Sequence, residues 1–443
     1  MALTKEVVPA SKDSVAYGKN LRAKVPLADH RLFSPPSRRD PLALLRAQDE
    51  TRLKDLLPLR YARMASSAFA YFRGSAAVMA SDLARRPRTG LIVQACGDAH
   101  LANFGVFATP ERSLVFDLND FDETVPAPWE WDVKRLATSV RMAARHNGIR
   151  EDRAEDIVEQ CLDRYAAKMD EYAQDRVLGV WYTKLDRQVV SASIPKALSR
   201  VKLKDSLHSL RKLTKSVGGT IQLAEKPPVL THVDPATQRE LSRDMDSYLA
   251  SLPVERHILV QRFTRIDFAR KVVGVGSVGT RCYIVLLRGR DMTDPLFLQL
   301  KEATASVLEA YGFPSEFKNH GARVVHGQRA IQATSDIFLG WCRVGGRDYY
   351  VRQLADEKGS FDLESMSPSV LARYSGICCW ALARAHARTG NPARLAGYLG
   401  RSPRFDDAVR KFSKTYADQM ECDHAQLQTA IRSGRIVADG AHA

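Results

Sequence analysis

A short stretch between Gly97 and Asp132 constrains the fold of this chain more than any other part. It reads GDAHLANFGVFATPERSLVFDLNDFDETVPAPWEWD, which is a polar loop, an apolar hairpin and then a group of carboxylates. Asp98 and Asn103 stand five residues apart in the loop, and the acidic group follows one hairpin later. Phosphoryl transfer uses such a set: one Asp orients or receives the attacking hydroxyl, while Asn and Asp side chains hold Mg²⁺. Mg²⁺ is a hard cation that prefers these oxygen ligands.

Three residues of the loop carry the predicted chemistry. Asp98 is expected to be the catalytic base or hydroxyl-orienting group, and its alternative is a turn-capping residue after a strand. His100 is the second catalytic candidate, because it could orient the loop or contact a phosphate; a histidine packed inside the loop is the alternative. Asn103 is expected to bind Mg²⁺, unless it only caps a turn.

The carboxylate that joins Asn103 at the metal is either Asp117 or Asp120. Asp117 lies 14 residues after Asn103, which is near the usual spacing for one short hairpin. Asp120 begins an Asp-Phe-Asp sequence that is similar to the kinase Asp-Phe-Gly, and it precedes Asp132 by 12 residues. We favour Asp120, with Asp117 second and Asp122 as an additional ligand. Carboxylates this close repel one another, and a divalent cation would offset the repulsion.

A glycine-rich motif lies far downstream, in GVGSVG followed by TRCYIVLL. Because β-branched and aromatic residues follow the last glycine, we expect a turn between two strands and not the strand-to-helix turn of a dinucleotide-binding fold. Such a turn can cover nucleotide phosphates with backbone N–H groups, and a lysine at the end of the next strand can pair with them. The alternative is an ordinary hairpin with a surface lysine. The expected nucleotide-binding residues are Gly274, Gly276, Ser277, Gly279 and Lys301.

The order of these motifs is unusual, because the glycine-rich turn follows the acidic loops by about 175 residues. In ordinary kinases it precedes them. Circular permutation would explain the order, and the helix expected over 370–388, which contains ALARAHAR, would then pack beside the Asp98 loop with Leu382 near Val93. Permutation is tolerated where the termini lie close together at the surface.

Composition limits the setting and the partners. The formal net charge is +15, but the densest basic run, 196–215, has no interleaved aromatic residues, so nucleic acid is not an expected partner. This run is either a solvated face or a patch for an anionic substrate. No apolar stretch is long enough for a membrane helix or a secretory signal. The seven cysteines show no paired spacing, which predicts free thiols and a cytoplasmic location.

We expect an α+β chain in two lobes. Helical periodicity runs from Pro41 to Arg85, including one amphipathic run over 66–85, and the chain should end in a pair of short helices. The expected division is an N-terminal arm (1–45), a helical lobe with the catalytic and metal-binding loops (46–185), a basic connector or insertion (186–254), a nucleotide-covering β lobe (255–360) and C-terminal helices that complete the helical lobe (361–443).

The segments GDAHLANFG, DLNDFDE and PWEWDVKRLA resemble the core of aminoglycoside and choline phosphotransferases. Together with RYARMASSAFAYFRG and the GVGSVGT, KEA and GRDYYVRQL stretches, they resemble more closely the bacterial domain-of-unknown-function family 2252 over nearly the whole chain. The resemblance implies a protein-kinase-like, circularly permuted fold, but it implies no particular substrate. Two departures from ordinary kinases are Cys96-Gly97 where His or Arg would stand, and the lack of an assigned glutamate partner for Lys301, with Glu302 and Glu309 as candidates.

The leading functional hypothesis is a phosphotransferase that uses ATP and Mg²⁺ and transfers a phosphoryl group to an unidentified hydroxyl-bearing acceptor. One alternative is a nucleotide-binding pseudokinase or regulatory protein, and another is transfer of AMP on the same fold. A metal-dependent hydrolase without a nucleotide is the remaining class, but no further histidine is suitably placed as a ligand. The acceptor and the oligomeric state are left open by the sequence.

Overall fold

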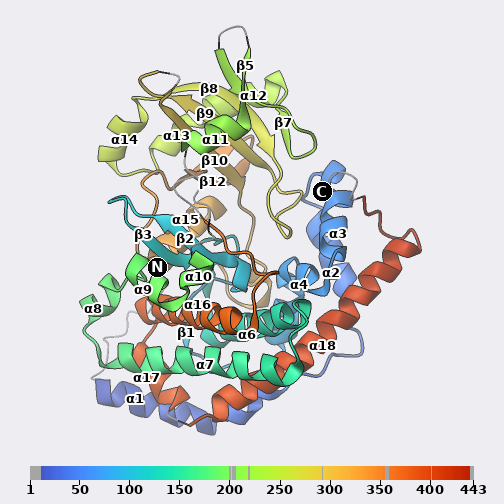
Figure 1. Ribbon diagram of the computed structural model, residues 1–443, viewed down its shortest axis with the longest axis vertical. Helices are drawn as coiled ribbons and strands as arrows, with labels where there is room; N and C mark the ends of the chain where they lie inside the picture. The colour runs from blue at the N-terminus through green and yellow to red at the C-terminus, as the bar shows by residue number, and fades with distance from the viewer. Residues whose placement is uncertain are drawn as a thin grey trace.

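The computed structural model of the chain describes residues 11–198, 201, 206–217, 220–291, 293–354, 359–400 and 402–439. Helices and antiparallel sheets make an α+β structure, as expected. Figure 1 shows a region built around a sheet at the top and a helical region below it. No helix within these residues is long and apolar enough to cross a membrane.

The upper region is built on a six-stranded antiparallel sheet. Its order is β11-β12-β10-β9-β8-β7. The expected meander forms β8, β9 and β10, and the glycine-rich turn joins the first two of these strands. The expected hairpin forms β11 and β12. The strands are β7 (Leu230–His232), β8 (Thr264–Lys271), β9 (Cys282–Arg288), β10 (Pro295–Glu302), β11 (Gly340–Val344) and β12 (Arg347–Gln353).

The segment expected to be a connector, 186–254, contributes to this upper region. Its strand β7 pairs with β8 at one edge of the sheet. Leu241 and Tyr248 of the following helices belong to one buried cluster with Leu298 of the sheet, so burial of apolar area holds the segment in place. Residues 199–200, 202–205 and 218–219 of the segment lie outside the described part. The other elements are α9 (Arg187–Ser193), α10 (Pro195–Leu198), α11 (Ser206–Leu213), β5 (Thr214–Val217), β6 (Thr220–Leu223), α12 (Pro235–Asp244), α13 (Asp246–Leu249) and, just beyond, α14 (Val254–Val260).

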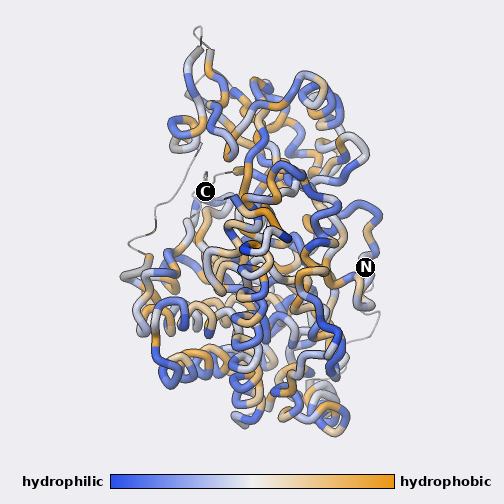
Figure 2. The backbone as a smooth tube through the Cα atoms, turned by 90° about the vertical axis from the view of Figure 1, so that its right-hand side faces the viewer, coloured by the Kyte–Doolittle hydropathy of each residue, from blue (hydrophilic) through white to orange (hydrophobic). Residues whose placement is uncertain are grey.

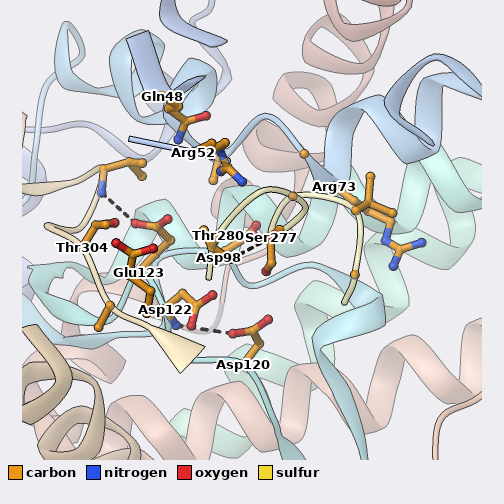
Figure 3. A pocket seen from close by; sticks show the side chains of 18 of the residues that line it. Gln48, Arg52, Arg73, Asp98, Asp120, Asp122, Glu123, Ser277, Thr280 and Thr304 are labelled. Atoms are coloured by element: carbon orange, nitrogen blue, oxygen red, sulfur yellow. Dashed lines mark hydrogen bonds between the residues drawn. The ribbon is translucent and has the colours of Figure 1, made fainter. Parts of the chain in front are cut away.

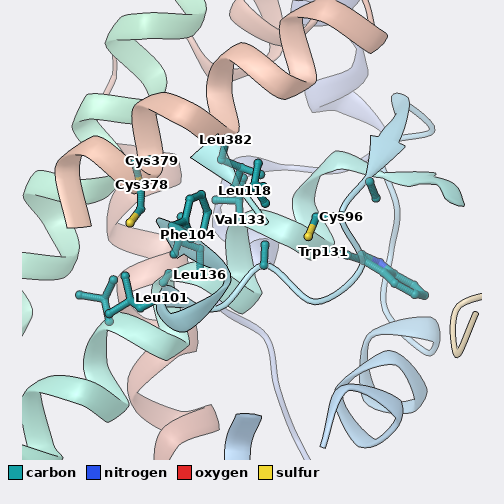
Figure 4. Packing of buried hydrophobic residues seen from close by; sticks show 14 of the residues in the cluster. Cys96, Leu101, Phe104, Leu118, Trp131, Val133, Leu136, Cys378, Cys379 and Leu382 are labelled. Atoms are coloured by element: carbon teal, nitrogen blue, oxygen red, sulfur yellow. The ribbon is translucent and has the colours of Figure 1, made fainter. Parts of the chain in front are cut away.

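The lower region contains the main hydrophobic core, and its outer helices alternate hydrophilic and hydrophobic stretches along their length (Figure 2). As expected, α16 packs against β1, and Leu382 lies in the same core cluster as Val93. Figure 4 shows Leu382 beside Leu118 and Val133. The helices are α6 (Trp129–His146), α7 (Glu151–Gln174), α8 (Val177–Tyr182), α16 (Pro368–Thr389), α17 (Pro392–Leu399) and α18 (Arg404–Arg432), and α15 (His320–Ile331) lies between the two regions.

Two small hairpin-like sheets carry the polar loops between these regions. β1 pairs with β4, and β2 pairs with β3, both in antiparallel register. The Asp98 loop leaves β1, and the acidic group leaves β3. The strands are β1 (Ile92–Ala95), β2 (Phe104–Ala108), β3 (Leu114–Leu118) and β4 (Val125–Pro128).

The expected single run over 66–85 is two helices, because the chain turns at Gly74. The backbone N–H of Gly74 closes the first helix on Ala70 O, and a Cβ at this position would lie 2.9 Å from Met64 Cε. The last helix, α18, has 29 residues, so the expectation of a pair of short C-terminal helices was wrong. The N-terminal helices are α1 (Ser11–Asn20), α2 (Pro41–Asp49), α3 (Leu57–Ala65), α4 (Ala68–Arg73) and α5 (Ala76–Ala84).

The N-terminal segment is anchored by the C-terminal helices. Arg39 bridges two carboxylates, with Nε 2.8 Å from Asp82 Oδ1 and Nη1 2.6 Å from Asp423 Oδ1 on α18. Helix α1 packs on α17. The described part of the N-terminal segment therefore packs against the C-terminal helices.

The expectation of free thiols was wrong for one pair. Cys161 on α7 and Cys379 on α16 form a disulfide, with Cα atoms 5.8 Å apart. They are 218 residues apart in the sequence and meet because the two helices pack together, so spacing alone could not reveal the pair. The other cysteines within the described residues are free: Cys96, Cys282, Cys342, Cys378 and Cys422.

Candidate functional site

A cleft of about 410 Å³ lies between the sheet region and the helical region. This volume is typical of small-molecule sites, which run from about 300 to 1,000 Å³. The Asp98 loop, the acidic group after β3 and the glycine-rich loop all line it, together with residues of α2 and α4 (Figure 3). The residues expected from the sequence that line the cleft are Asp98, His100, Asn103, Asp120, Gly274, Gly276 and Ser277.

Asp132, in the first turn of α6, holds the Asp98 loop by hydrogen bonds to its backbone. The two carboxylate oxygens of Asp132 accept hydrogen bonds from the backbone N–H groups of Cys96 and Gly97, at 2.7 and 2.9 Å. Gly97 has φ +81°, and a Cβ there would lie 2.4 Å from Glu123 O. Glycine is therefore required for the close turn that presents Asp98. His386 of α16 lies 3.3 Å from Asp132 and completes this support.

Asp98 is paired with Arg135, which the sequence reasoning missed. Arg135 Nε donates to Asp98 Oδ1 at 2.7 Å, and its guanidinium stacks on the Phe72 ring at 4.1 Å. Arg135 follows Asp132 by three residues on α6, so the two side chains share one helix face. The three-residue spacing between Asp132 and Arg135 was the sequence signal that could have identified Arg135. The pair orients the Asp98 carboxylate at the floor of the cleft.

His100 is almost fully buried beside Asp98, with 4% of its surface exposed. Its Nε2 lies 3.7 Å from Asp98 Oδ2. Burial lowers the pKa of His100 to about 3, against the opposing field of Asp98, so the ring is neutral at physiological pH. Its Nδ1 has no hydrogen-bond partner among the described residues. Asn103 contributes to the same loop by donating from Nδ2 to Asp98 O at 2.8 Å.

Lys301 is the cation at the base of the acidic group. It is buried, contacts Asp122 Oδ2 and lies 3.8 Å from Asp120 Oδ1. Burial would lower the pKa of Lys301, but the two carboxylates outweigh it and raise this pKa, so the lysine is charged. Tyr350 also donates to Asp122, at 2.9 Å.

The two carboxylates next to Lys301 differ in charge balance. Burial and the neighbouring Asp122 raise the pKa of Asp120. Burial also acts on Asp122, but Lys301 and the Tyr350 hydroxyl outweigh it and lower the pKa of Asp122. Asp120 is therefore the less compensated carboxylate of the cleft, and the one that gains most from an added cation.

Asp117 does not reach the cleft. Its carboxylate is 1% exposed and is bound by Arg384 Nη2 at 2.7 and 2.8 Å, and its Oδ2 also accepts from Ala333 N. The side chain points from β3 into the core toward α16. The choice of Asp117 as second metal ligand is corrected by this position, because its oxygens already serve a buried arginine.

The expected glutamate partners of Lys301 are engaged elsewhere. Glu302 pairs with Arg281 and Arg347, at 3.2 and 3.0 Å. Glu309 lies 3.6 Å from Arg323. Asp120 and Asp122 take the place of a glutamate at Lys301.

The glycine-rich loop lies directly over the cleft. Gly274 and Gly279 have φ +68° and +90°, a region that glycine enters without strain. A Cβ on Gly276 would lie 3.3 Å from Arg73 O, so the loop tip touches the turn after α4. Gly279 lies behind the cleft wall, where its carbonyl accepts from Leu53 N at 2.8 Å.

Glu123 is a further cleft residue that the sequence reasoning did not select. Its Oε2 accepts from the backbone N–H of Val307 at 2.7 Å. Burial raises the pKa of Glu123 to about 7. No group of three or more His, Cys, Asp or Glu side chains arranged to hold a metal ion by themselves occurs within the described residues. Any cation here would need ligands from a bound molecule or water as well.

Comparison with curated proteins and with solved structures found no match. A family model does match, over residues 52–430, and it is described as an uncharacterized protein conserved in bacteria. The match spans the Asp98 loop, the acidic group, the glycine-rich loop and α16. The chain therefore belongs to the domain-of-unknown-function family 2252.

Proposed function

We propose that this protein is an ATP- and Mg²⁺-dependent phosphotransferase that transfers a phosphoryl group to a hydroxyl-bearing acceptor. The observation that carries the proposal is the single cleft lined by both the Asp98 loop and the glycine-rich loop. These segments are about 175 residues apart in the sequence, and phosphoryl transfer needs both kinds of loop at one place.

The nucleotide is proposed to bind beneath the glycine-rich loop. Backbone N–H groups at Gly274 to Ser277 suit phosphate oxygens, because they are neutral donors that a side chain does not obstruct. Lys301 does not itself line the cleft: its charged ammonium is buried behind the lining residues Asp120 and Asp122, and the phosphates would meet it only between these two carboxylates.

The donor set of the cleft fits Mg²⁺. Asp120, Asn103 and Asp122 offer carboxylate and amide oxygens, and Asp120 lacks a full counter-charge. Mg²⁺ commonly takes one or two carboxylates and completes its shell with phosphates and water. When bound, the metal would neutralise charge on the phosphates of the nucleotide.

Asp98 is proposed to orient the acceptor hydroxyl and to receive its proton. The hydroxyl oxygen forms a bond to the terminal phosphorus, the bond from that phosphorus to the bridging oxygen breaks, and ADP leaves. Arg135 fixes the direction of the Asp98 carboxylate through the hydrogen bond to its Oδ1, and neutral His100 borders its other oxygen.

The arrangement also supports the proposal of a circularly permuted, protein-kinase-like fold. The sheet that carries the glycine-rich loop follows the Asp98 loop in sequence, yet lies over it in space (Figure 1). Helix α16, from the end of the chain, packs beside β1, where the helix that precedes the catalytic loop of an ordinary kinase would stand.

One observation favours a nucleotide-binding regulatory protein as the second candidate. Asp98 Oδ1 is already bound by Arg135, so only part of this carboxylate is left to bind an acceptor hydroxyl. Such a protein would bind the nucleotide in the same cleft without transferring a phosphoryl group.

The test is calorimetric titration of the wild type and Asp98→Asn with ATP in Mg²⁺, together with formation of ADP in the presence of a mixture of hydroxyl compounds, because transfer to any acceptor leaves ADP. We expect both proteins to bind ATP with similar affinity, and turnover to fall by a factor of about 10² to 10⁴ in the variant. Binding without turnover in the wild type would favour the regulatory protein. Absence of ATP binding by the wild type would refute both candidates.

A further inference from the structure

The wall of the cleft is completed by a segment that comes from neither the sheet nor the Asp98 loop. Gln48, Thr51 and Arg52, between α2 and α3, line the cleft opposite the acidic group. This segment is fastened to the glycine-rich loop by the bond from Leu53 N to Gly279 O. Val278 of the loop is fully buried in a small apolar cluster with residues of the segment, namely Leu53, Leu56 and Leu59.

Arg52 is the cation of this wall. Its Nη1 donates to Val278 O at 2.5 Å, and Figure 3 shows its side chain entering the cleft beside the glycine-rich loop. In the described part of the chain it forms no ion pair, although a guanidinium carries five N–H donors. Burial and the repulsion of Arg60 lower the pKa of Arg52 to about 9, and the fields of Asp49, Glu123 and Asp122 offset only part of this effect.

Arg52 lines the cleft, whereas Lys301 lies buried behind Asp120 and Asp122. Lys301 is held by Asp120 and Asp122, so much of its charge is already compensated. Arg52 has one backbone acceptor and donors left for a ligand. A guanidinium binds phosphate through two parallel hydrogen bonds, which makes it well suited to a terminal phosphate group.

We propose that Arg52 binds the terminal phosphate of the nucleotide, so that the N-terminal segment supplies part of the active site. This inference rests on the proposed function and deepens it. An arginine placed there stabilises the negative charge of the transferring group, as the arginine fingers of other phosphoryl-transfer enzymes do. The same side chain holds Val278 O, so it would join the terminal phosphate to the glycine-rich loop.

Arg63 offers a matched control. It also donates to the glycine-rich loop, from Nη1 to Gly274 O at 2.7 Å, but it does not line the cleft. Removal of Arg63 therefore tests the effect of loosening the loop without removal of a cation from the cleft. Arg52→Lys tests whether charge without the planar donor pair is sufficient.

The experiment is calorimetric titration of the wild type, Arg52→Ala, Arg52→Lys and Arg63→Ala with ATP, ADP and AMP in Mg²⁺. We expect Arg52→Ala to weaken ATP binding about tenfold or more beyond a small loss shared with ADP and AMP, because a charge-assisted contact to the terminal phosphate is lost in addition to the bond that holds the loop. Arg52→Lys should recover part of the loss. Arg63→Ala should change all three affinities by a similar, smaller factor. Thermal unfolding of each variant verifies that it is folded.

The possible outcomes distinguish this inference from the proposed function on which it rests. Equal weakening of ATP, ADP and AMP in Arg52→Ala would limit Arg52 to holding the loop and would overturn the phosphate contact. An unchanged preference for ATP over ADP would overturn it as well. In both cases the wild type still binds ATP and the proposed function stands, whereas a wild type that binds no nucleotide would remove both.

Discussion

Asp117 and Asp120 stand three residues apart at the end of one strand, but they lie in opposite kinds of surroundings. Asp117 is sealed in the core against Arg384, which is itself fully buried. Asp120 faces the cleft, with its carboxylate about one third exposed and 3.8 Å from the nearest ammonium. The strand turns one carboxylate inward and the other outward, so the two serve separate purposes.

The difference teaches how to distinguish a structural acid from a functional one. A buried carboxylate such as Asp117, whose two oxygens both accept from Arg384 Nη2, ties a strand to a helix and needs no ligand. Asp120, whose pKa is raised by burial and by Asp122, lies in an open cleft beside other carboxylates, and perturbed groups of this kind are typical of binding sites.

The largest effect on stability is expected from removal of the buried carboxylate, Asp117. Asp117→Ala would leave Arg384 buried and unpaired, so we expect the free energy of unfolding to fall by about 3–5 kcal/mol. Denaturant unfolding measures it. Asp120→Ala is the control, and its stability should stay within about 1 kcal/mol of the wild type, because Asp120 is partly exposed. Equal losses in the two variants would contradict the distinction.

Asp406 is a third carboxylate that can be compared with these two. It is buried, but within the described residues no arginine forms an ion pair with it. Burial and the nearby Asp163 and Glu159 raise the pKa of Asp406 from 3.8 to about 7. The folded protein thus holds this proton more tightly than the unfolded chain between about pH 4 and pH 7. Its contribution to stability is therefore present at low pH and is lost as the pH rises through this window.

Asp406→Asn cannot ionise and should escape that loss. We expect the variant and the wild type to be equally stable near pH 4, and the variant to be more stable above pH 7, by at most about 4 kcal/mol for three pKa units. Thermal and denaturant unfolding from pH 4 to 8 would measure the difference. A stability difference that does not change with pH would show that Asp406 titrates normally.

The smallest effect is expected for Asp120, the carboxylate that faces the cleft, and it concerns nucleotide affinity. Asp120→Ala should reduce the Mg²⁺-dependent part of ATP affinity about tenfold, on the order of 1.4 kcal/mol, because one oxygen ligand is lost while Asn103 and Asp122 remain. Titration with ATP in Mg²⁺ and in EDTA gives this part directly. Binding in EDTA should stay the same or strengthen, and an undiminished Mg²⁺ effect would exclude Asp120 as a ligand.

Much of the cleft could be predicted from the sequence, because its motifs are local. The Asp98 loop, the acidic group and the glycine-rich turn are each contiguous and carry their own spacing, and the meander between β8 and β10 follows from its β-branched residues. The position of Asp132 after the hairpin was also a signal, since an acidic side chain in the first turn of this helix can reach back to the backbone of the loop.

The rest depends on contacts between distant segments, which spacing does not encode. Arg384 follows Asp117 by 267 residues, so the sealed pair could not be recognised, and Asp117 was retained as a metal ligand. Arg52 precedes the glycine-rich loop by more than 200 residues and shows no motif of its own. The length of helix α18 is an exception, because its apolar residues already follow a helical spacing in the sequence and the expectation of a short helix overlooked it.

The ion pairs of Arg39 with Asp82 and Asp423 bear on how this protein folds during its synthesis. Asp423 follows Arg39 by 384 residues. A ribosome that adds about 5–20 residues per second needs roughly 20 to 80 s to reach it. During that interval the segment that carries Arg52 has left the ribosome without its anchor on α18. Completion of the cleft therefore waits for the last long helix, so a nascent or prematurely ended chain exposes acidic loops but lacks a fixed cationic wall.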